Sequence, residues 1–364
     1  MNKKKTATVT WITYRNFGTF LQAYALQKVI IMLGYENTIL SDKNIIESFR
    51  NPSVIYSILS RIKRFVLSLK KQPIGILDSK YCYDHFAKQF MKIDYDWKNQ
   101  EELNDRYDTF LCGSDQIWSP NVPFHSYYYL AFTDKKKIAY APSMGSFNYP
   151  ENKISIIKPY LEKFSFLSVR EVQGEKIIKE KFNLNCQTVI DPTLLLERTD
   201  WENLITKDSD KEYVLCYLLT YNKKYLQYVR KFADTKGYEL RVFITDPRYI
   251  KFADIPLYVG PLEFLSEIRN STYFFTDSFH GSVFGILFER DFYTFKRFKD
   301  GAKNNQNSRV LNLFEKLNLL DRFLSEEELN SVENLVLIDY PLVRERLKLE
   351  REKSLSFLKG ALSE

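Results

Sequence analysis

A histidine near the start of a predicted helix is the clearest candidate for acid–base chemistry in this sequence. The run Thr276–Gly281 (TDSFHG) follows a buried strand and opens a helix. Helix N-termini offer unpaired N–H groups and a partial positive charge, so they favour bound anions. His280, one of only three histidines, can exchange a proton near neutral pH. We predict a catalytic His280 beside an anion site at Ser278, Gly281 and Ser282; the alternative is that His280 caps the helix or bonds a carbonyl.

Two arginines could add positive charge to such an anion site. Arg170 stands at the end of the predicted strand Phe164–Val169, from which it could point into a cleft. Its planar fork matches a carboxylate or a phosphate. A surface salt bridge with Glu171 or Glu175 is the alternative. Arg309 follows a polar run of asparagines, glutamine and serine that leads into a helix, and it too is available for an anion.

Two other loops carry polar groups of the kind that a sugar site needs. In Gly113–Trp118 (GSDQIW) the glycine permits a tight turn after a strand, and Ser, Asp and Gln side chains stand beside a tryptophan. An Asx-type turn with a buried tryptophan explains the same residues. The loop Tyr14–Thr19, after the first strand, should also face the cleft. It contains neither a dinucleotide-binding glycine pattern nor a phosphate-binding P-loop sequence.

Metal binding has little support in the sequence. The three histidines are isolated, and no HxH or HExxH pattern occurs. Two aspartate pairs have DxD spacing, at residues 94–96 and 208–210, but such short spacing arises easily in solvated loops. The four cysteines are far apart and form no CxxC pair, as expected of free thiols in a reducing compartment. We predict no metal site.

Composition sets the broad class. The 364 residues include 53 basic and 46 acidic side chains, a mild excess that favours anionic partners without the clustered pattern of a nucleic-acid face. No apolar run approaches the roughly 20 residues of a membrane span. We therefore expect a cytoplasmic protein. The basic, amphipathic segment 54–71 could touch an anionic membrane surface; an ordinary helix packed on a sheet is the alternative.

Strand and helix patterns alternate along the chain, as in parallel α/β folds. In the first half, strands are predicted near residues 6–13, 38–40, 109–112, 137–141, 164–169 and 188–190, and helices near 19–33 and 171–181. In the second half, strands are predicted near 213–219, 240–245, 272–276 and 291–295, and helices near 224–235, 261–270, 281–289, 309–317 and 343–358.

The chain is too long for a single hydrophobic core, which stops growing near roughly 250–300 residues. We predict an α/β protein with two Rossmann-like domains facing a cleft, residues 1–195 on the acceptor side and 196–364 on the donor side. The last helix is expected to pack back on the first domain. Ligands of open α/β sheets bind beyond the carboxyl ends of the strands, so the loops above should carry the chemistry.

Five segments, in one order along the chain, resemble the polysaccharide pyruvyl transferase family. They read NFGTFLQAYALQ, GSDQIW, SVRE, DPT and TDSFHG, at residues 16–27, 113–118, 168–171, 191–193 and 276–281, within a resemblance that spans about 8–312. Each is modest alone, but five in series are specific. The resemblance implies a GT-B-like fold, phosphoenolpyruvate as donor, a sugar of a surface polysaccharide as acceptor, and a ketal formed across two hydroxyls.

The resemblance also implies roles for particular residues. Arg170 and His280 match positions that bind the donor. Many members carry an arginine two residues before this histidine, where this chain has Ser278, so Arg309 or a lysine would have to replace that cation. His280 is the expected acid and Asp115 the expected base, with no cofactor. The donor is expected at Arg170, Ser278, Gly281, Ser282 and Arg309, and the acceptor at Asn16, Gly18, Ser114, Gln116 and Trp118.

Two alternatives remain open at this stage. One is a GT-B glycosyltransferase that uses a nucleotide sugar. The other is a non-catalytic protein of polysaccharide biosynthesis that binds a polysaccharide or a partner enzyme, an alternative motivated by the missing arginine. The expected partners are phosphoenolpyruvate and a sugar or lipid-linked oligosaccharide, with no nucleic acid.

Overall fold

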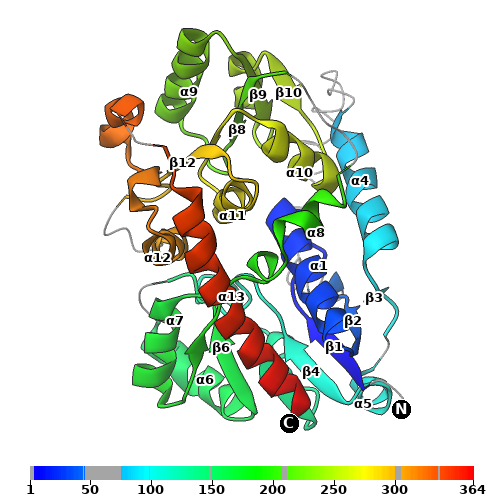
Figure 1. Ribbon diagram of the computed structural model, residues 1–364. Helices are drawn as coiled ribbons and strands as arrows, with labels where there is room; N and C mark the ends of the chain where they lie inside the picture. Colours follow the sequence, from blue (N-terminus) through cyan, green and yellow to red (C-terminus); the bar gives the residue numbers. More distant parts are fainter. Residues whose placement is uncertain are drawn as a thin grey trace, which may run out of the picture.

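The computed structural model describes residues 4–43, 45, 75–97, 99–146, 149–205, 211–299, 305–334 and 337–364. Within them, two parallel β-sheets lie one above the other in Figure 1, each flanked by helices. The segment 54–71 and the aspartate pair at 208–210 fall outside the described residues. No helix in the described part of the chain is both long and apolar enough to cross a membrane.

The first sheet has the strand order β3-β2-β1-β4-β5-β6-β7. Its strands are β1 (Lys5–Val9), β2 (Glu36–Leu40), β3 (Ile93–Asp94), β4 (Thr109–Cys112), β5 (Lys136–Ala139), β6 (Phe166–Val169) and β7 (Gln187–Thr188). Neighbouring strands are parallel, and β1 lies between β2 and β4. Helices α1 (Phe17–Met32), α4 (Gly75–Phe90), α5 (Gln100–Arg106), α6 (Glu151–Leu161) and α7 (Val172–Ile177) belong to this half.

The second sheet has the order β10-β9-β8-β11-β12-β13, also parallel. Its strands are β8 (Tyr213–Tyr217), β9 (Glu239–Phe243), β10 (Ile255–Leu257), β11 (Tyr273–Thr276), β12 (Asp291–Phe295) and β13 (Phe323–Leu324). The helices after β7 are α8 (Arg198–Glu202), α9 (Lys223–Lys236), α10 (Pro261–Asn270), α11 (Phe279–Leu287), α12 (Ser308–Leu317) and α13 (Tyr340–Ser363).

The predicted fold class is therefore confirmed: two α/β units with parallel sheets. Side chains of β8 alternate between two cores, with Tyr213, Leu215 and Tyr217 on one face and Val214 and Cys216 on the other. A strand buried on both faces reads as a continuous apolar run, which is why its position was predictable. The first strand is shorter than expected, ending at Val9, because residues 10–16 form the loop that leads into α1.

One hydrophobic core is shared by the two sheets. It includes residues of α1, α10, α11 and α13. Helix α1 is apolar on nearly all sides, as expected of a helix enclosed by protein rather than lying on a surface. Trp201 of α8 connects the halves, since its ring meets Tyr24 of α1 at 5.7 Å and Phe284 of α11 at 5.0 Å. The two halves therefore support each other through a common apolar interior.

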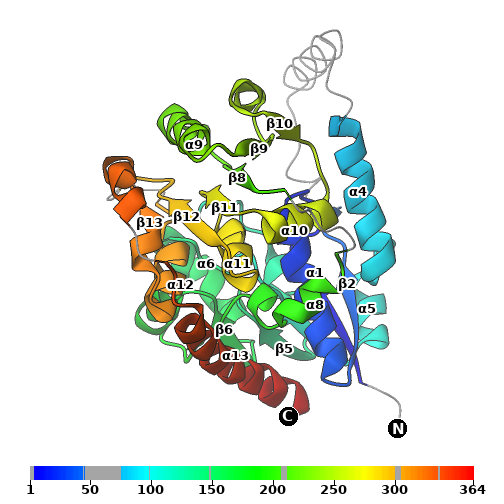
Figure 2. The same cartoon turned by 45° about the horizontal axis from the view of Figure 1, so that its top comes forward.

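Helix α13, red in Figures 1 and 2, runs from the second half toward the first sheet. It packs on α12 and then passes the first domain. Ser354 accepts a hydrogen bond from the backbone N–H of Ile190 at 3.0 Å, and the Phe357 ring lies 6.4 Å from Tyr140 of the first domain. Arg351 donates to the carbonyl of Leu194 at 2.8 Å. The chain end thus ties the segment after β7 to the rest of the fold.

Trp201→Ala tests how strongly this shared core stabilises the protein. The side chain is fully buried, and its indole N–H donates to the carbonyl of Thr193 at 3.2 Å. Loss of a buried tryptophan typically costs about 3–5 kcal/mol, because a cavity replaces its contacts. We expect a large fall in the urea midpoint of unfolding. Leu337→Ala, at a 79% exposed side chain, is the control and should leave the midpoint unchanged.

Candidate functional site

The loops that follow the strands of both sheets converge on one buried carboxylate, Asp191. Arg170, at the end of β6, donates from Nη1 to Asp191 Oδ2 at 2.5 Å, and Ser114, after β4, donates to the same oxygen at 3.2 Å. The other oxygen accepts from the backbone N–H and the hydroxyl of Thr193, at 3.0 and 2.7 Å. Burial would raise the pKa of Asp191, but the nearby His280 and Arg170 hold that pKa below its ordinary value.

His280 reaches this carboxylate from the second domain. Its Nε2 lies 3.4 Å from Asp191 Oδ2, and the residue is 7% exposed. On its other side the imidazole lies against the backbone of Gly18, where an added Cβ would come within 1.9 Å of Nδ1. Only glycine leaves room for the ring there. The contact places the histidine of the second domain directly against the first turn of α1.

Two arginines flank one phenylalanine beside this histidine. The guanidinium carbons of Arg170 and Arg309 lie 4.6 and 5.8 Å from the centre of the Phe279 ring. Arg170 also has Glu171 at 3.8 Å. Arg309 donates to the side-chain oxygen of Gln306 at 3.1 Å. Burial, followed by the positive charge of Arg170, lowers the pKa of Arg309. The described residues give Arg309 no carboxylate within ion-pair distance.

Several N–H groups of these arginines are buried without a partner. Arg170 uses Nη1 for Asp191, while its Nε and Nη2 have no hydrogen-bond acceptor among the described residues. The same holds for Nε of Arg309. A buried polar group that lacks a partner is costly and calls for an explanation. Since Nε and Nη2 form one edge of a guanidinium, Arg170 presents the edge that binds a carboxylate or phosphate in two-point fashion.

Asp115 completes the polar cluster from the loop after β4. Its Oδ2 accepts from the Thr19 hydroxyl at 2.7 Å, and its Oδ1 from the backbone N–H of Gln116 at 2.8 Å. Asp115 has a φ of 73°, a left-handed backbone conformation that is uncommon outside glycine. Its charge also acts on Arg170 and Arg309. The cluster thus combines acid–base groups with positive charge that is only partly neutralised.

Comparison with known families agrees with this arrangement. A sequence model of the family described as polysaccharide pyruvyl transferase matches residues 16–297. The chain belongs to this family. The resemblance predicted from the sequence is confirmed, and as a member of the family the chain is a transferase of polysaccharide modification. No curated protein matches it.

Solved structures share the fold at low sequence identity. The co-structure of S. aureus MnaA with UDP is 9% identical, covers 99% of this chain and 97% of its own, and has a TM-score of 0.52. The UDP-GlcNAc 2-epimerase from Methanocaldococcus jannaschii is 11% identical, covers 96% and 99%, and has a TM-score of 0.50. These likenesses support the predicted GT-B-like arrangement of two Rossmann-like domains.

The start of α11 in this pyruvyl transferase family member differs from the expected anion site. Ser278 caps the helix by accepting from the Gly281 N–H at 3.2 Å. Gly281 is needed for packing, since an added Cβ would lie 2.4 Å from the Thr276 hydroxyl. The Ser282 hydroxyl donates to the Ser278 carbonyl and meets Thr294 of β12 at 2.8 Å. The Ser282 hydroxyl is therefore bonded within the protein, and the predicted part of Ser282 in the anion site at the helix N-terminus stays a prediction.

Trp118 also requires a correction. The sequence prediction assigns it to the acceptor, but the side chain is 1% exposed and its ring stacks on Tyr129 with centres 5.5 Å apart. Its indole N–H donates to the carbonyl of Tyr128 at 3.1 Å. The tryptophan packs in the core of the first domain and so fixes the loop that follows β4. Gln116, by contrast, reaches across to Gln306 of the second domain at 3.0 Å.

Other predicted site residues hold the loops in place. Asn16 caps α1 by accepting from the Gly18 N–H at 3.0 Å, and Ser114 is fully buried on Asp191. The alternative for Arg170 was a surface salt bridge with Glu171 or Glu175. Arg170 does lie 3.8 Å from Glu171, but both side chains are buried, and Glu175 accepts from Thr188 instead. Among the described residues, no group of three or more acidic, histidine or cysteine side chains could hold a metal.

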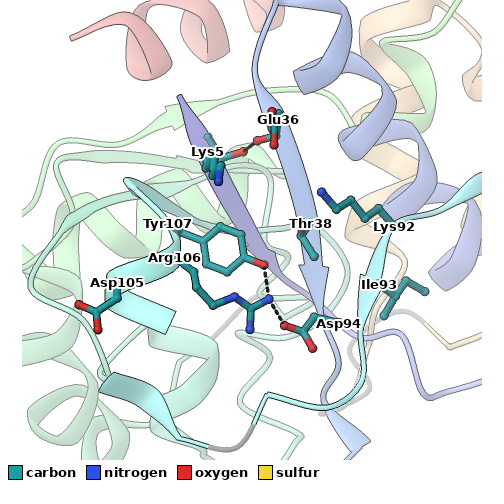
Figure 3. A pocket seen from close by; sticks show the side chains of 10 residues that line it. Lys5, Glu36, Thr38, Lys92, Ile93, Asp94, Asp105, Arg106 and Tyr107 are labelled. Atoms are coloured by element: carbon teal, nitrogen blue, oxygen red, sulfur yellow. Dashed lines mark hydrogen bonds and ion pairs between the residues drawn. The ribbon is translucent and has the colours of Figure 1, made fainter. Parts of the chain in front are cut away.

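A polar pocket lies at the opposite end of the strands of the first sheet, where β1 and β2 begin. Figure 3 shows it lined by Lys5, Glu36 and Thr38, with Arg106 directed at Asp94. Those last two side chains neutralise each other at a distance of 2.5 Å. Ligands of open parallel sheets bind at the carboxyl ends of the strands, so this pocket is separate from the site.

Asp191, Asp277 and Phe279 are the residues of the site whose roles sequence reasoning missed. The only signal for Asp191 was its place directly after a strand, in the DPT segment. Asp277 is buried, and its oxygens accept from the backbone N–H groups of Leu219 and Thr220 at 2.6 and 3.0 Å. Burial raises the pKa of Asp277 to about 6, although Arg297 at 3.7 Å acts in the opposite direction.

Asp277→Asn should reveal this raised pKa in the pH dependence of stability. An acid with a raised pKa in the folded state adds stability at low pH and loses that contribution as pH rises through the folded-state value. Relative to the variant, the wild type should therefore lose stability between about pH 4 and pH 6. Urea midpoints at pH 4, 5, 6 and 7 measure the difference. Asp134→Asn, at an exposed side chain, is the control; a difference independent of pH would contradict the assignment.

Proposed function

We propose that this transferase moves pyruvate from phosphoenolpyruvate to a sugar of a surface polysaccharide and forms a cyclic ketal. One observation carries the proposal. Beside His280, two arginines have buried N–H donors without a partner, and Nε2 of His280, itself without a hydrogen bond, lies 3.4 Å from the carboxylate of Asp191. Such a site calls for a small, doubly anionic ligand next to an acid–base group.

The charges of phosphoenolpyruvate suit these donors. The molecule carries both a carboxylate and a phosphate, so a site with two fixed cations suits it. Arg170 offers its Nε–Nη2 edge, which makes no hydrogen bond although Glu171 lies 3.8 Å from Nε, and Arg309 offers Nε. Arg309 would thereby supply the cation that Ser278 does not provide. A bound anion would also offset the burial and the repulsion from Arg170, which together lower the pKa of Arg309.

The chemistry follows from protonation of the enol. His280 in its protonated form gives a proton to C3 of the donor, which becomes a methyl group and leaves C2 electrophilic. One sugar hydroxyl then bonds to C2 and releases its proton to a base, for which Asp115 is the candidate. A second hydroxyl bonds to C2 as the bond from C2 to the phosphate oxygen breaks, and its proton returns to His280. The proton held by Asp115 passes to the departing phosphate, which restores the base. The products are the ketal and inorganic phosphate.

In this reaction Asp191 would act as a positioning residue. Its carboxylate, 3.4 Å from His280 Nε2, lies where it orients the imidazole and stabilises the positive charge of the protonated ring. The same oxygen binds Arg170. Asp191 therefore lies next to both His280 and Arg170. The proton donor and the arginine that binds the substrate would keep a fixed separation.

A nucleotide-sugar glycosyltransferase is the second candidate. Two proteins of the same fold motivate it, one solved with UDP and one named a UDP-GlcNAc 2-epimerase. A thermal-shift comparison of UDP-sugars with phosphoenolpyruvate separates the candidates. Stabilisation by phosphoenolpyruvate alone supports pyruvyl transfer, while stabilisation by a UDP-sugar alone favours glycosyl transfer.

His280→Gln should abolish turnover without unfolding the protein. Glutamine keeps polar atoms near Asp191 but cannot deliver a proton, and loss of general acid catalysis typically costs about 10²–10⁴-fold in rate. Phosphate release from phosphoenolpyruvate, with mass spectrometry of the sugar product, measures the effect. His125→Gln, at a histidine that caps a turn in the first domain, is the matched control. Full activity in His280→Gln would refute the assignment.

Arg309→Met should weaken donor binding more than it slows the chemical step. Methionine keeps much of the side-chain length but removes the positive charge, and a hydrogen bond to a charged group contributes about 1.5–3 kcal/mol. We therefore expect KM for phosphoenolpyruvate to rise by roughly tenfold or more. Arg344→Met, at an exposed arginine paired with Glu289, should behave like wild type. An unchanged KM in Arg309→Met would mean that another group binds the donor.

A further inference from the structure

A cavity of about 500 Å³ lies between the two domains. Its first-domain wall is the loop Tyr14–Phe17 with Tyr83 of α4, and its second-domain wall comes from the carboxyl ends of β8, β9 and β10. Phe17 connects the two walls, because its ring stacks on that of Phe264 in α10 of the second domain, with ring centres 4.3 Å apart. The cavity exists only where the two domains meet.

The cavity adjoins the reacting groups at two points. Phe17 and Asn16 in its wall directly precede Gly18, against which the His280 ring lies. On the second-domain side, the carbonyl of Tyr217 accepts a hydrogen bond from the backbone N–H of Asp277 at 3.3 Å, three residues before His280. A molecule in this cavity is therefore next to the acid–base residue without occupying the arginine site.

The lining favours a neutral, hydroxyl-rich ring. Four tyrosines and two phenylalanines contribute to it: Tyr14, Tyr83, Tyr217, Tyr258, Phe17 and Phe243. Aromatic faces pack against the C–H groups of a sugar, while tyrosine hydroxyls and the nearby amide and threonine bond its hydroxyls. A purely aliphatic chain would leave these polar groups unused.

The same lining disfavours a nucleotide diphosphate. Arg15 is the only charged side chain among the described lining residues, and it faces Asp84 at 3.6 Å. Helix α10 begins at the cavity, but Pro261 at its first position has no N–H. The preceding Gly260 N–H is already bonded to the carboxylate of Glu263 at 3.1 Å. That helix start carries negative charge of its own, so it offers little to a phosphate.

We propose that this interdomain cavity binds the sugar of the acceptor and directs its hydroxyls toward the donor at Arg170 and Arg309. The inference rests on the proposed function for the role of the sugar, but the binding of a glycoside can be measured by itself. The acceptor contacts are then Tyr14, Tyr258 and their neighbours in the cavity wall, and the buried Trp118 is not among them.

The test is saturation-transfer NMR with methyl glycosides of glucose, galactose and N-acetylmannosamine. At least one should receive saturation from the wild-type protein. In the double variant Tyr14→Ala and Tyr258→Ala, its affinity should fall by about tenfold, because two aromatic contacts are removed. Tyr81→Ala is the matched control: this tyrosine of α4 is 70% exposed and stacks on His85 outside the cavity. A loss of affinity in the control as large as in the double variant would overturn the proposal.

Phosphoenolpyruvate in the same samples, followed by broadening of its phosphorus signal, separates this inference from the proposed function. If phosphoenolpyruvate binds and no glycoside does, the cavity is not the acceptor site, while the donor assignment stands. If a glycoside binds in a Tyr258-dependent way and phosphoenolpyruvate does not, the cavity assignment stands and the donor is wrong. Displacement of the glycoside by UDP would overturn the sugar assignment in favour of a nucleotide.

Discussion

The site depends on one buried anion. Asp191 has no exposed surface at its side chain, yet it is ionised because an arginine and a histidine share its charge. Removing one partner of a buried ion pair leaves the other charge uncompensated, at a cost of about 3–5 kcal/mol. Asp191 is also fixed through Thr193 at the start of a short helical turn, so its position does not depend on the charges alone. Acid, cation and backbone are locked together at the end of β7.

This arrangement explains why the fold must keep its two domains in a close relation. Asp191 and Arg170 come from the first domain, but His280 comes from the second, and its place is set by contact with Gly18. Any opening of the domains would separate the acid from its carboxylate. The shared core around Trp201 and the return of α13 to Ile190 oppose such an opening. Packing around Trp201 and α13, away from the site, therefore helps to fix the position of His280 relative to Asp191.

Sequence reasoning succeeded where the signal is local. The strand β11 and the helix α9 lie within one residue of their predicted bounds, because β11 is a compact apolar run and α9 has the period of an amphipathic helix. The edge strands β3, β10 and β13 have only two or three residues and show no period, so they were not predictable. Helix α6 contains Pro159, a residue that argues against a helix interior.

The site was only partly predictable, because contacts between its residues are set by the tertiary structure. Which loops would take part followed from their position after strands, and His280, Arg170 and Asp115 do meet there. Their partners are set by tertiary contacts: Asp191 is 21 residues from Arg170, and Gly18 approaches His280 from the other domain. Trp118 shows the limit most clearly. The polar neighbours of a tryptophan suggest a binding surface, but only the fold decides that its ring turns inward onto Tyr129.

Both domains hold their first loop in the same way. In the first, Asp42 follows β2 and accepts from the backbone N–H and the hydroxyl of Thr13, at 3.0 and 2.5 Å, beside the end of β1. In the second, Asp277 follows β11 and accepts from Leu219 and Thr220 beside the end of β8. Burial raises the pKa of both aspartates.

These two loops form opposite walls of the interdomain cavity, through Tyr14 and Leu219. A carboxylate that bonds backbone N–H groups fixes a loop more rigidly than exposed side chains can, because the buried charge has no competing water. Rigid walls reduce the ordering that a weakly bound sugar would otherwise impose on the protein. A neutral ligand can therefore be positioned beside His280 without the strong charges that hold the donor. The two substrates are distinguished by the interactions of their sites: arginines bind the donor, and aromatic and polar side chains bind the sugar.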